Sequence, residues 1–386
     1  METQTSADLQ GQSSRTLATW ISFSYLAVWA YVLYGLGTAT PYLRTDLRLT
    51  DFEAGLHASA LAVGVLASGI GADRVARRIG TGWLADLAVA VAVGGLALIV
   101  LAPDLWVSLA GALLLGVGGG TLGTDVNVKL SNSGGSQTRR LMGQANAISM
   151  ITAAAAPLAI GLAASQLHAW RAALLIPAFA FLGLSLIRPR ETEPGSAFRA
   201  PQSRLPRAYW LAWLLIVLVV SIEFSFVFWG STIVGKRTGI SNADATLLAS
   251  LFVVGMFVGR AAIGRGLGAG RQPHILLAAG LLIAAAGASL TWVSTVPLLS
   301  GVGLLLGGLG TAGLFPIGLT VALQTSPRAR LQAAARTTLG SGLAVLLAPS
   351  TLGLAADTVG VVAAWPIVLG LALGGLVVLA ATPRAA

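Results

Sequence analysis

The chain has 386 residues, of which 55% are hydrophobic and only 10% are charged, and its mean hydropathy is +0.82. Because a soluble domain carries about 25% charged residues, this composition excludes an ordinary soluble fold. The sequence has no cysteine and three dispersed histidines, at positions 57, 168 and 274, which excludes thiol chemistry and gives no metal-ligand spacing. The net charge of +10 would suggest nucleic-acid binding in a soluble protein. In a membrane protein it indicates basic loops on one side of the bilayer, so we expect no nucleic-acid partner.

The first 16 residues are polar. Residues 1–14 lack the basic flank and the cleavage site of a signal peptide, and we expect a disordered cytoplasmic tail over residues 1–16. Beyond it, apolar runs of about 20 residues recur, which is the length of helix that crosses a bilayer. These runs do not alternate polar and apolar residues as barrel strands do. Twelve spans are predicted, near residues 17–40, 52–71, 83–102, 106–128, 141–165, 171–187, 209–234, 245–263, 275–294, 297–323, 331–355 and 361–381.

The first span supplies two candidate site residues. Tyr31 and Tyr34 lie inside this span and share roughly one helix face with Ser24 and Thr38. A tyrosine deep in a span can line a substrate cavity, whereas one near the end of a span usually anchors the helix at the interface. We predict Tyr31 and Tyr34 as cavity residues and keep anchoring as the alternative.

A charged motif follows the second span, with the sequence Gly69-Ile-Gly71-Ala-Asp73-Arg74-Val-Ala-Arg77-Arg78. It resembles the signature that the major facilitator superfamily carries between its second and third helices, although Ala76 stands where the family usually has glycine. The resemblance implies an all-α membrane protein with twelve transmembrane helices, in two six-helix bundles related by pseudo-twofold symmetry. It also implies transport of a small molecule by alternating access, with no cofactor and no enzymatic activity.

The resemblance further implies a latch on the cytoplasmic side. In that latch Asp73 faces the start of the eleventh span, and a motif arginine reaches an acid on the fourth span. Asp125 is available near that end of the fourth span, and Arg336 lies at the start of the eleventh. The alternatives are that the arginines only fix topology and that Asp125 pairs with Lys129 four residues on, or handles a proton. The predicted gate residues are Gly69, Asp73, Arg74, Arg77, Arg78, Asp125 and Arg336.

Two asparagines flank the predicted cytoplasmic mouth of the fourth and fifth spans. Asn127 and Asn146 carry amides that could contact a substrate. The alternative is an interhelical hydrogen bond, which is the usual role of an amide in a membrane bundle. We include both residues among the site candidates.

The two halves of the chain resemble each other and are joined by a proline-rich linker. Residues 156–164 match residues 348–356 at an offset of 192, and residues 113–116 match residues 304–307 at an offset of 191. Parallel repeats of this kind are typical of two-bundle transporters. We therefore predict a tail over 1–16, a six-helix bundle over 17–187, a cytoplasmic linker over 188–208 and a second six-helix bundle over 209–386.

Glu223 lies near the middle of the seventh span. A charge at the bilayer centre costs at least about 2.5–3.5 kcal/mol, so an acid kept there usually faces a cavity or a partner. Glu223 could take up and release a proton, hold a cationic or polyhydroxyl substrate, or bond to neighbouring hydroxyls in a structural role. Trp229 could stack on a ring or a cation of the substrate, or anchor the interface. Arg260 and Arg336 lie inside or at the edge of spans, and no cationic partner is expected deep in the first bundle. A deep cavity with one acid and no base argues against large anionic substrates.

The distribution of basic residues predicts the orientation. Of the 24 Lys and Arg, 17 fall in the set of loops that includes both termini and 5 in the opposite set. Both termini are therefore predicted to be cytoplasmic, in the inner membrane. We expect a monomeric, proton-coupled secondary transporter whose partners are a small-molecule substrate, protons or another ion, and the lipid bilayer. The alternatives are a facilitative uniporter or channel-like permease of the same fold, and a membrane-embedded enzyme or sensor.

Overall fold

The structure, a computed structural model, describes residues 6–131, 135–189, 204–266, 270–326 and 329–383. Within these ranges it does not describe the side chains of residues 6–16, 73, 131, 135–140 and 331. Every regular element of the described residues is a helix, and 12 helical segments are long and apolar enough to cross a membrane. The predicted all-α fold with twelve spans is therefore confirmed.

The helices fall into two groups along the chain. The first, here called the N group, contains α1 (Ser6–Leu47), α2 (Asp51–Ile79), α3 (Thr81–Leu101), α4 (Leu105–Ser131), α5 (Gly135–Leu167), the short 3-10 helix η1 (Trp170–Leu174) and α6 (Leu175–Ile187). The second, the C group, contains α7 (Arg207–Thr238), α8 (Asn242–Gly264), α9 (Pro273–Val293), α10 (Pro297–Thr311), α11 (Leu314–Gln324), α12 (Arg330–Val359), α13 (Val361–Ala364) and α14 (Pro366–Ala381).

Several helix boundaries differ from the sequence prediction. The expected disorder over residues 1–16 is wrong from Ser6 onward, because α1 already begins there. Adding turns to an existing helix avoids the cost of nucleation. The tenth span is interrupted at Ala312 and Gly313, between α10 and α11. The twelfth is divided into α13 and α14 just before Pro366, a residue that lacks a backbone N–H donor.

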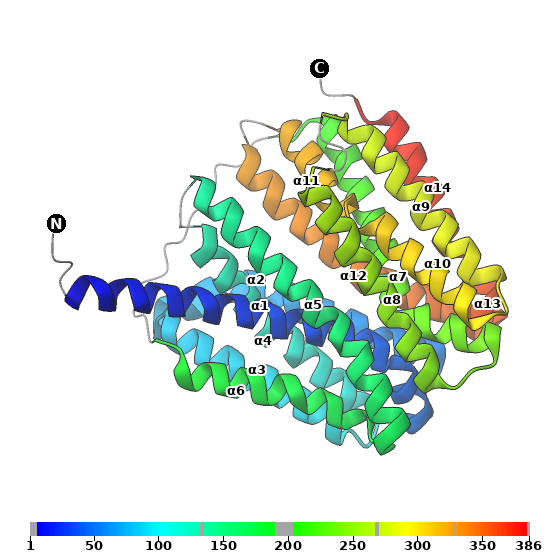
Figure 1. Ribbon diagram of the computed structural model, residues 1–386, viewed down its shortest axis with the longest axis horizontal. Coiled ribbons are helices and arrows are strands. Elements are labelled where there is room, and N and C mark those ends of the chain that lie inside the picture. Colours follow the sequence, from blue (N-terminus) through cyan, green and yellow to red (C-terminus); the bar gives the residue numbers. More distant parts are fainter. Residues whose placement is uncertain (1–5, 132–134, 190–203, 267–269, 327–328, 384–386) are drawn as a thin grey trace.

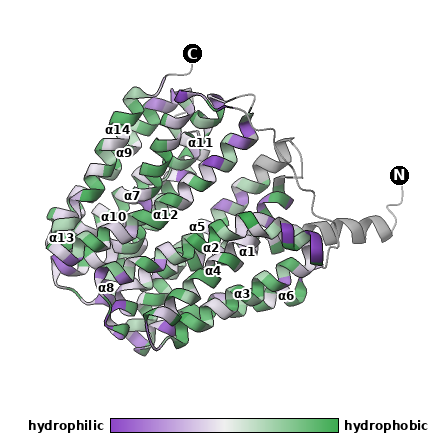
Figure 2. Cartoon of the chain, turned by 180° about the vertical axis from the view of Figure 1, so that it is seen from behind, coloured by the Kyte–Doolittle hydropathy of each residue, from purple (hydrophilic) through white to green (hydrophobic). Residues whose placement is uncertain are grey.

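The two groups lie side by side and converge at the end of the molecule that is away from both termini (Figure 1). Hydrophobic residues cover most of the helix length, and hydrophilic residues gather toward the helix ends (Figure 2). Large apolar side chains face outward, including Leu186, which is 87% exposed, and Leu101, which is 77% exposed. Such an outer surface suits hydrocarbon rather than water.

Glycines let helices within each group approach to backbone contact. On α2 and α4, Gly64 and Gly116 face each other so closely that a Cβ on Gly116 would overlap the Leu61 carbonyl. In the C group, Gly255 of α8 and Gly308 of α10 make the corresponding contact, at offsets of 191 and 192 residues from Gly64 and Gly116. The structural counterpart of Gly116 is therefore Gly308, one residue beyond the Gly307 that the sequence match pairs with it. Membrane helices rely on this close packing because lipid supplies no hydrophobic force between them.

Candidate functional site

The two groups contact each other mainly on one side of the molecule. We call the side where the first span begins and α14 ends the termini side, and the opposite side the far side. Between the groups, α2 packs on α12, α5 packs on α8, and α1 packs on α7. The helices of the two groups spread apart toward the termini side in Figure 1.

A carboxylate from the C group caps a helix of the N group on the far side. Asp357, near the end of α12, accepts hydrogen bonds from the backbone N–H groups of Asp51 at 2.7 Å and Phe52 at 2.9 Å. Both donors belong to the first turn of α2, where the helix dipole favours a negative charge. The backbones can come this close because Gly55 of α2 and Gly353 of α12 lie in the contact. A side chain at either position would overlap the backbone of the facing helix.

Further contacts close the far side. The Tyr42 hydroxyl of α1 donates to Thr246 of α8 at 3.2 Å. The Ser59 hydroxyl of α2 donates to the Leu346 carbonyl of α12 at 2.5 Å. On α5, Gly161 packs against Leu247 of α8. These residues lie in the far halves of their helices, so the far side is closed in this structure.

At mid-depth, one hydrogen bond joins the groups through an acid. The Tyr34 hydroxyl of α1 donates to Glu223 Oε1 of α7 at 2.6 Å, and Met256 Sδ of α8 lies 3.6 Å from the same hydroxyl. Tyr34 is 4% exposed and Glu223 is 9% exposed. A hydrogen bond to a carboxylate is short and roughly twice as strong as one between neutral groups. The structure thus brings together two of the predicted site residues from opposite halves of the sequence.

A base also reaches this depth, which corrects the expectation from the sequence. Arg260 of α8 donates through Nε to the Ala312 carbonyl at 3.3 Å and through Nη1 to Met150 Sδ of α5 at 3.0 Å. It is close enough to interact electrostatically with Tyr34. Side chains lean toward the N-terminus of their own helix, and α8 begins on the far side. Arg260 therefore extends inward from its backbone position near the termini side.

Comparison with known proteins identifies the family to which the chain belongs. The family model for the Major Facilitator Superfamily matches residues 18–274, which is well over half of the chain. The chain belongs to this superfamily. It is therefore a multi-pass membrane transporter of a small molecule rather than an enzyme. No curated protein matches the sequence.

Solved structures of superfamily members resemble this transporter along nearly its whole length. A bacterial homologue of the human lysosomal transporter Spinster, inward-facing and unoccupied, has 16% identity and a TM-score of 0.70, covering 96% of this chain and 94% of its own. A mutant of the nucleoside transporter NupG has 14% identity and a TM-score of 0.75, covering 96% and 100%. A transporter of the POT family, in complex with a thioalcohol-conjugated peptide, has 13% identity and a TM-score of 0.75, covering 95% of each chain. At such identities the likeness shows the fold and does not assign a substrate.

The predicted gate residues of this transporter lie on the termini side. Arg74 donates to the Ile70 carbonyl of its own helix at 2.9 Å, and Asp125 pairs with Lys129 at 3.1 Å. Neither contact crosses between the groups. The remaining side chains Arg77, Arg78 and Arg336 are exposed, an added Cβ on Gly69 would meet no atom within 4 Å, and the Asp73 side chain lies outside the described residues. The latch stays a prediction about a state in which this side is closed.

The other predicted site residues have different surroundings. The Tyr31 hydroxyl donates to the Ala173 carbonyl at 2.9 Å, inside the N group. Trp229 is 1% exposed and donates through Nε1 to the Pro349 carbonyl at 3.0 Å, inside the C group. Asn127 and Asn146 are exposed, and Asn146 donates to the Met142 carbonyl one turn earlier. Of the six predicted substrate and coupling residues, the structure brings only Tyr34 and Glu223 together across the groups.

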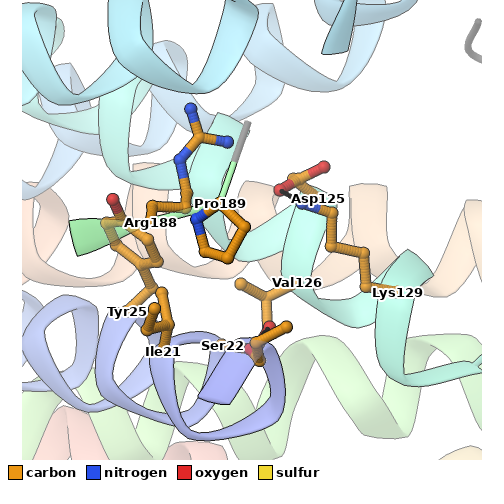
Figure 3. A pocket seen from close by; sticks show the side chains of 9 residues that line it. Ile21, Ser22, Tyr25, Asp125, Val126, Lys129, Arg188 and Pro189 are labelled. Atoms are coloured by element: carbon orange, nitrogen blue, oxygen red, sulfur yellow. Dashed lines mark hydrogen bonds and ion pairs between the residues drawn. The ribbon is translucent and has the colours of Figure 1, made fainter. Parts of the chain in front are cut away.

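A small pocket opens on the termini side within the N group of this transporter. Its lining includes Tyr25, Asp125, Lys129 and Arg188 (Figure 3). The Arg188 side chain, which the sequence placed in the linker, is only 6% exposed and pairs with Asp86 of α3 at 2.8 Å. The pair of Arg188 with Asp86 holds the start of the predicted linker against α3.

Two residues of the interface between the groups were missed from the sequence. In the sequence Asp357 resembles any acid in a loop. Nothing near it indicates its partners, Asp51 and Phe52, which are about 300 residues away. Arg260 looked like a span-edge cation, although the direction of side chains on a helix was a usable signal.

Proposed function

We propose that this chain is a proton-coupled secondary transporter that works by alternating access and carries its coupling proton on Glu223. The observation that supports this most is the hydrogen bond from Tyr34 to Glu223. It places a buried acid at mid-depth and joins it to the opposite group. An intramembrane acid is costly and is usually kept for a function.

The contacts between the groups support alternating access. The far side is held by Asp357 at the start of α2, and by Tyr42 with Thr246. The described side chains of the predicted gate residues make no hydrogen bond or ion pair across the groups. Opening the far side requires these polar contacts to break, and closing the termini side would bring Asp73 and Arg336 toward each other. We propose that the N group and the C group are the two bundles that rock against each other.

Glu223 can couple protonation to that motion. When ionised, it accepts a charge-assisted hydrogen bond from Tyr34 that favours the far-side-closed state. When protonated, it accepts only a neutral hydrogen bond, which is about half as strong. A proton arriving at Glu223 would therefore loosen the contact between the groups.

The orientation follows from the basic residues. Since 17 of the 24 Lys and Arg belong to the termini-side segments, we propose that the termini side is cytoplasmic and that the membrane is the inner membrane. The state described would then be closed to the outside.

Transport into proteoliposomes tests the coupling. The substrate is first found by thermal-shift screening of the purified protein against sugars, organic acids, amino acids and lipophilic cations. With an inward proton gradient, wild type is expected to accumulate it above equilibrium, and an ionophore that dissipates the gradient should abolish accumulation. Glu223→Gln should lose accumulation while keeping counterflow exchange, because exchange needs binding and rocking but no net proton transfer.

The control is Asp104→Asn, an exposed acid that caps only its own helix. It should accumulate substrate as wild type does. Accumulation by Glu223→Gln at the wild-type level would remove Glu223 from coupling. Equilibration without accumulation by wild type itself would favour a facilitative uniporter instead.

A further inference from the structure

Arg260 is a cation inside a span whose charge has no partner among the described residues. The ion pairs of the described chain involve Arg44, Lys129, Arg171 and Arg188, so none of the described carboxylates lies within 4.0 Å of Arg260. Its two hydrogen bonds go to neutral acceptors, the Ala312 carbonyl and the Met150 sulfur. A thioether is only a weak acceptor. These bonds position the side chain without neutralising it.

The guanidinium retains donors that a ligand can use. It carries five N–H groups, and the Nη2 amino group makes no hydrogen bond with any described residue. That group is not among the buried polar atoms that lack a partner, so it remains accessible. Because an uncompensated charge within a span is expensive, a cation kept there is expected to meet an anion during function.

We infer that Arg260 binds the carboxylate of a small organic anion, which is the transported substrate. This inference rests on the proposed function and names its substrate class. The planar guanidinium matches a carboxylate with two parallel hydrogen bonds, which a lysine ammonium cannot do. The sulfur of Met150 contacts Arg260, and Met256, one turn earlier on α8, contacts the Tyr34 hydroxyl. These adaptable apolar groups suit the hydrocarbon part of an organic acid.

The same geometry links the anion to the proton. The titratable and charged groups that face this place are Tyr34 from α1, Glu223 from α7 and Arg260 itself. The described contacts of Arg260 from α5 and from the α10–α11 break are the neutral Met150 and Ala312. An ionised Glu223 would repel an anion held nearby. Anion binding is therefore favoured when Glu223 holds a proton, so that the two are carried in the same direction.

Binding to the purified full-length protein tests this directly. The probes are short aliphatic and aromatic monocarboxylates, the primary amides of the same acids, inorganic phosphate and a quaternary ammonium, measured by thermal shift and calorimetry. We expect a carboxylate to bind while its amide does not. Arg260→Gln should weaken that binding about tenfold or more, and Arg260→Lys should also weaken it because the bidentate geometry is lost. Arg265→Gln, an exposed site at the end of α8, should bind as wild type does.

The comparison of acid with amide uses the wild-type protein, so it does not depend on any variant folding. The inference would be overturned by equal binding of acid and amide, by binding confined to the amide or the quaternary ammonium, or by no carboxylate binding at all. Unchanged affinity in a well-folded Arg260→Gln would also overturn it. Tighter binding at lower pH that disappears in Glu223→Gln would support the link to the proton. Binding that needs Arg260, together with gradient-driven accumulation that survives Glu223→Gln, would refute the coupling proposal and retain the anion site.

Discussion

Removing the Tyr34 hydroxyl should shift the balance between the two states of the transporter. Tyr34→Phe keeps the ring and deletes the group that donates to Glu223 at 2.6 Å across the groups. A hydrogen bond to a charged group contributes about 1.5–3 kcal/mol. If the bond exists only while the far side is closed, its loss should change the ratio of closed to open far side by about 10- to 150-fold. Glu223→Gln should shift the ratio less, because the amide oxygen still accepts a neutral hydrogen bond.

The absence of native cysteine makes the measurement direct. Spin labels on Ala169→Cys and Thr295→Cys report the separation of the groups at exposed far-side positions. At neutral pH wild type should give mainly the shorter far-side distance, and Tyr34→Phe should give mainly the longer one. Acidification should move wild type toward the distribution of Glu223→Gln, because protonation removes the charge from the acceptor. The same acidification should leave Glu223→Gln unchanged.

Tyr31→Phe is the matched control. It deletes a hydroxyl from the same helix, but that hydroxyl bonds to Ala173 within the N group. Its distance distribution should equal that of wild type. If Tyr34→Phe also equals wild type at every pH, the hydrogen bond does not hold the groups together, and the coupling argument fails.

Two further predictions concern the far-side contact and the helix packing. Asp357→Asn removes a charge from the start of α2, where it contributes about 0.3–1 kcal/mol and up to about 2 kcal/mol when partly buried, so the same labels should report about a 2- to 30-fold shift toward the open far side. Asp104→Asn should cause no shift, since Asp104 caps only its own helix; equal distributions for the two variants would contradict the prediction. Gly116→Leu should destabilise the protein by about 1–3 kcal/mol or more, because its side chain would overlap the α2 backbone at Leu61. Gly94→Leu has open space and should melt as wild type does in a thermal unfolding assay; similar melting of both would show that α2 and α4 can separate freely.

The sequence predicted the features that depend on local composition. Each span needs about 20 apolar residues, so twelve such runs predict twelve membrane spans, as the described residues show. The sequence repeat paired residues 113–116 with 304–307, which is one residue away from the structural correspondence of Gly116 with Gly308. Glu223 stood out because an acid in the middle of an apolar run is costly.

The remaining features depend on contacts between distant segments. The contact of Asp357 with Asp51 joins residues 306 positions apart, and neither residue differs locally from other acids near helix ends. The break at Ala312 and Gly313 lies in a continuously apolar stretch, so hydropathy could not locate it. Tyr31 and Tyr34 are three residues apart, and only the packing of α1 determines that one faces its own group while the other faces the C group.

The placement of the mid-depth residues gives the transporter a physical basis for coupling. Both charged side chains, Glu223 and Arg260, belong to the C group, while Tyr34 and Met150, their partners across the interface, belong to the N group. The two charges therefore move together and keep their spacing. When the groups separate, Tyr34 and Met150 move away from Glu223 and Arg260 at the same time. A carboxylate bound to Arg260 and a proton bound to Glu223 each lower the cost of that separation, because each neutralises a charge that the opposite group would otherwise stabilise. With one ligand alone, an uncompensated charge remains in the span, so separation of the groups is expected to be most favourable when both sites are filled.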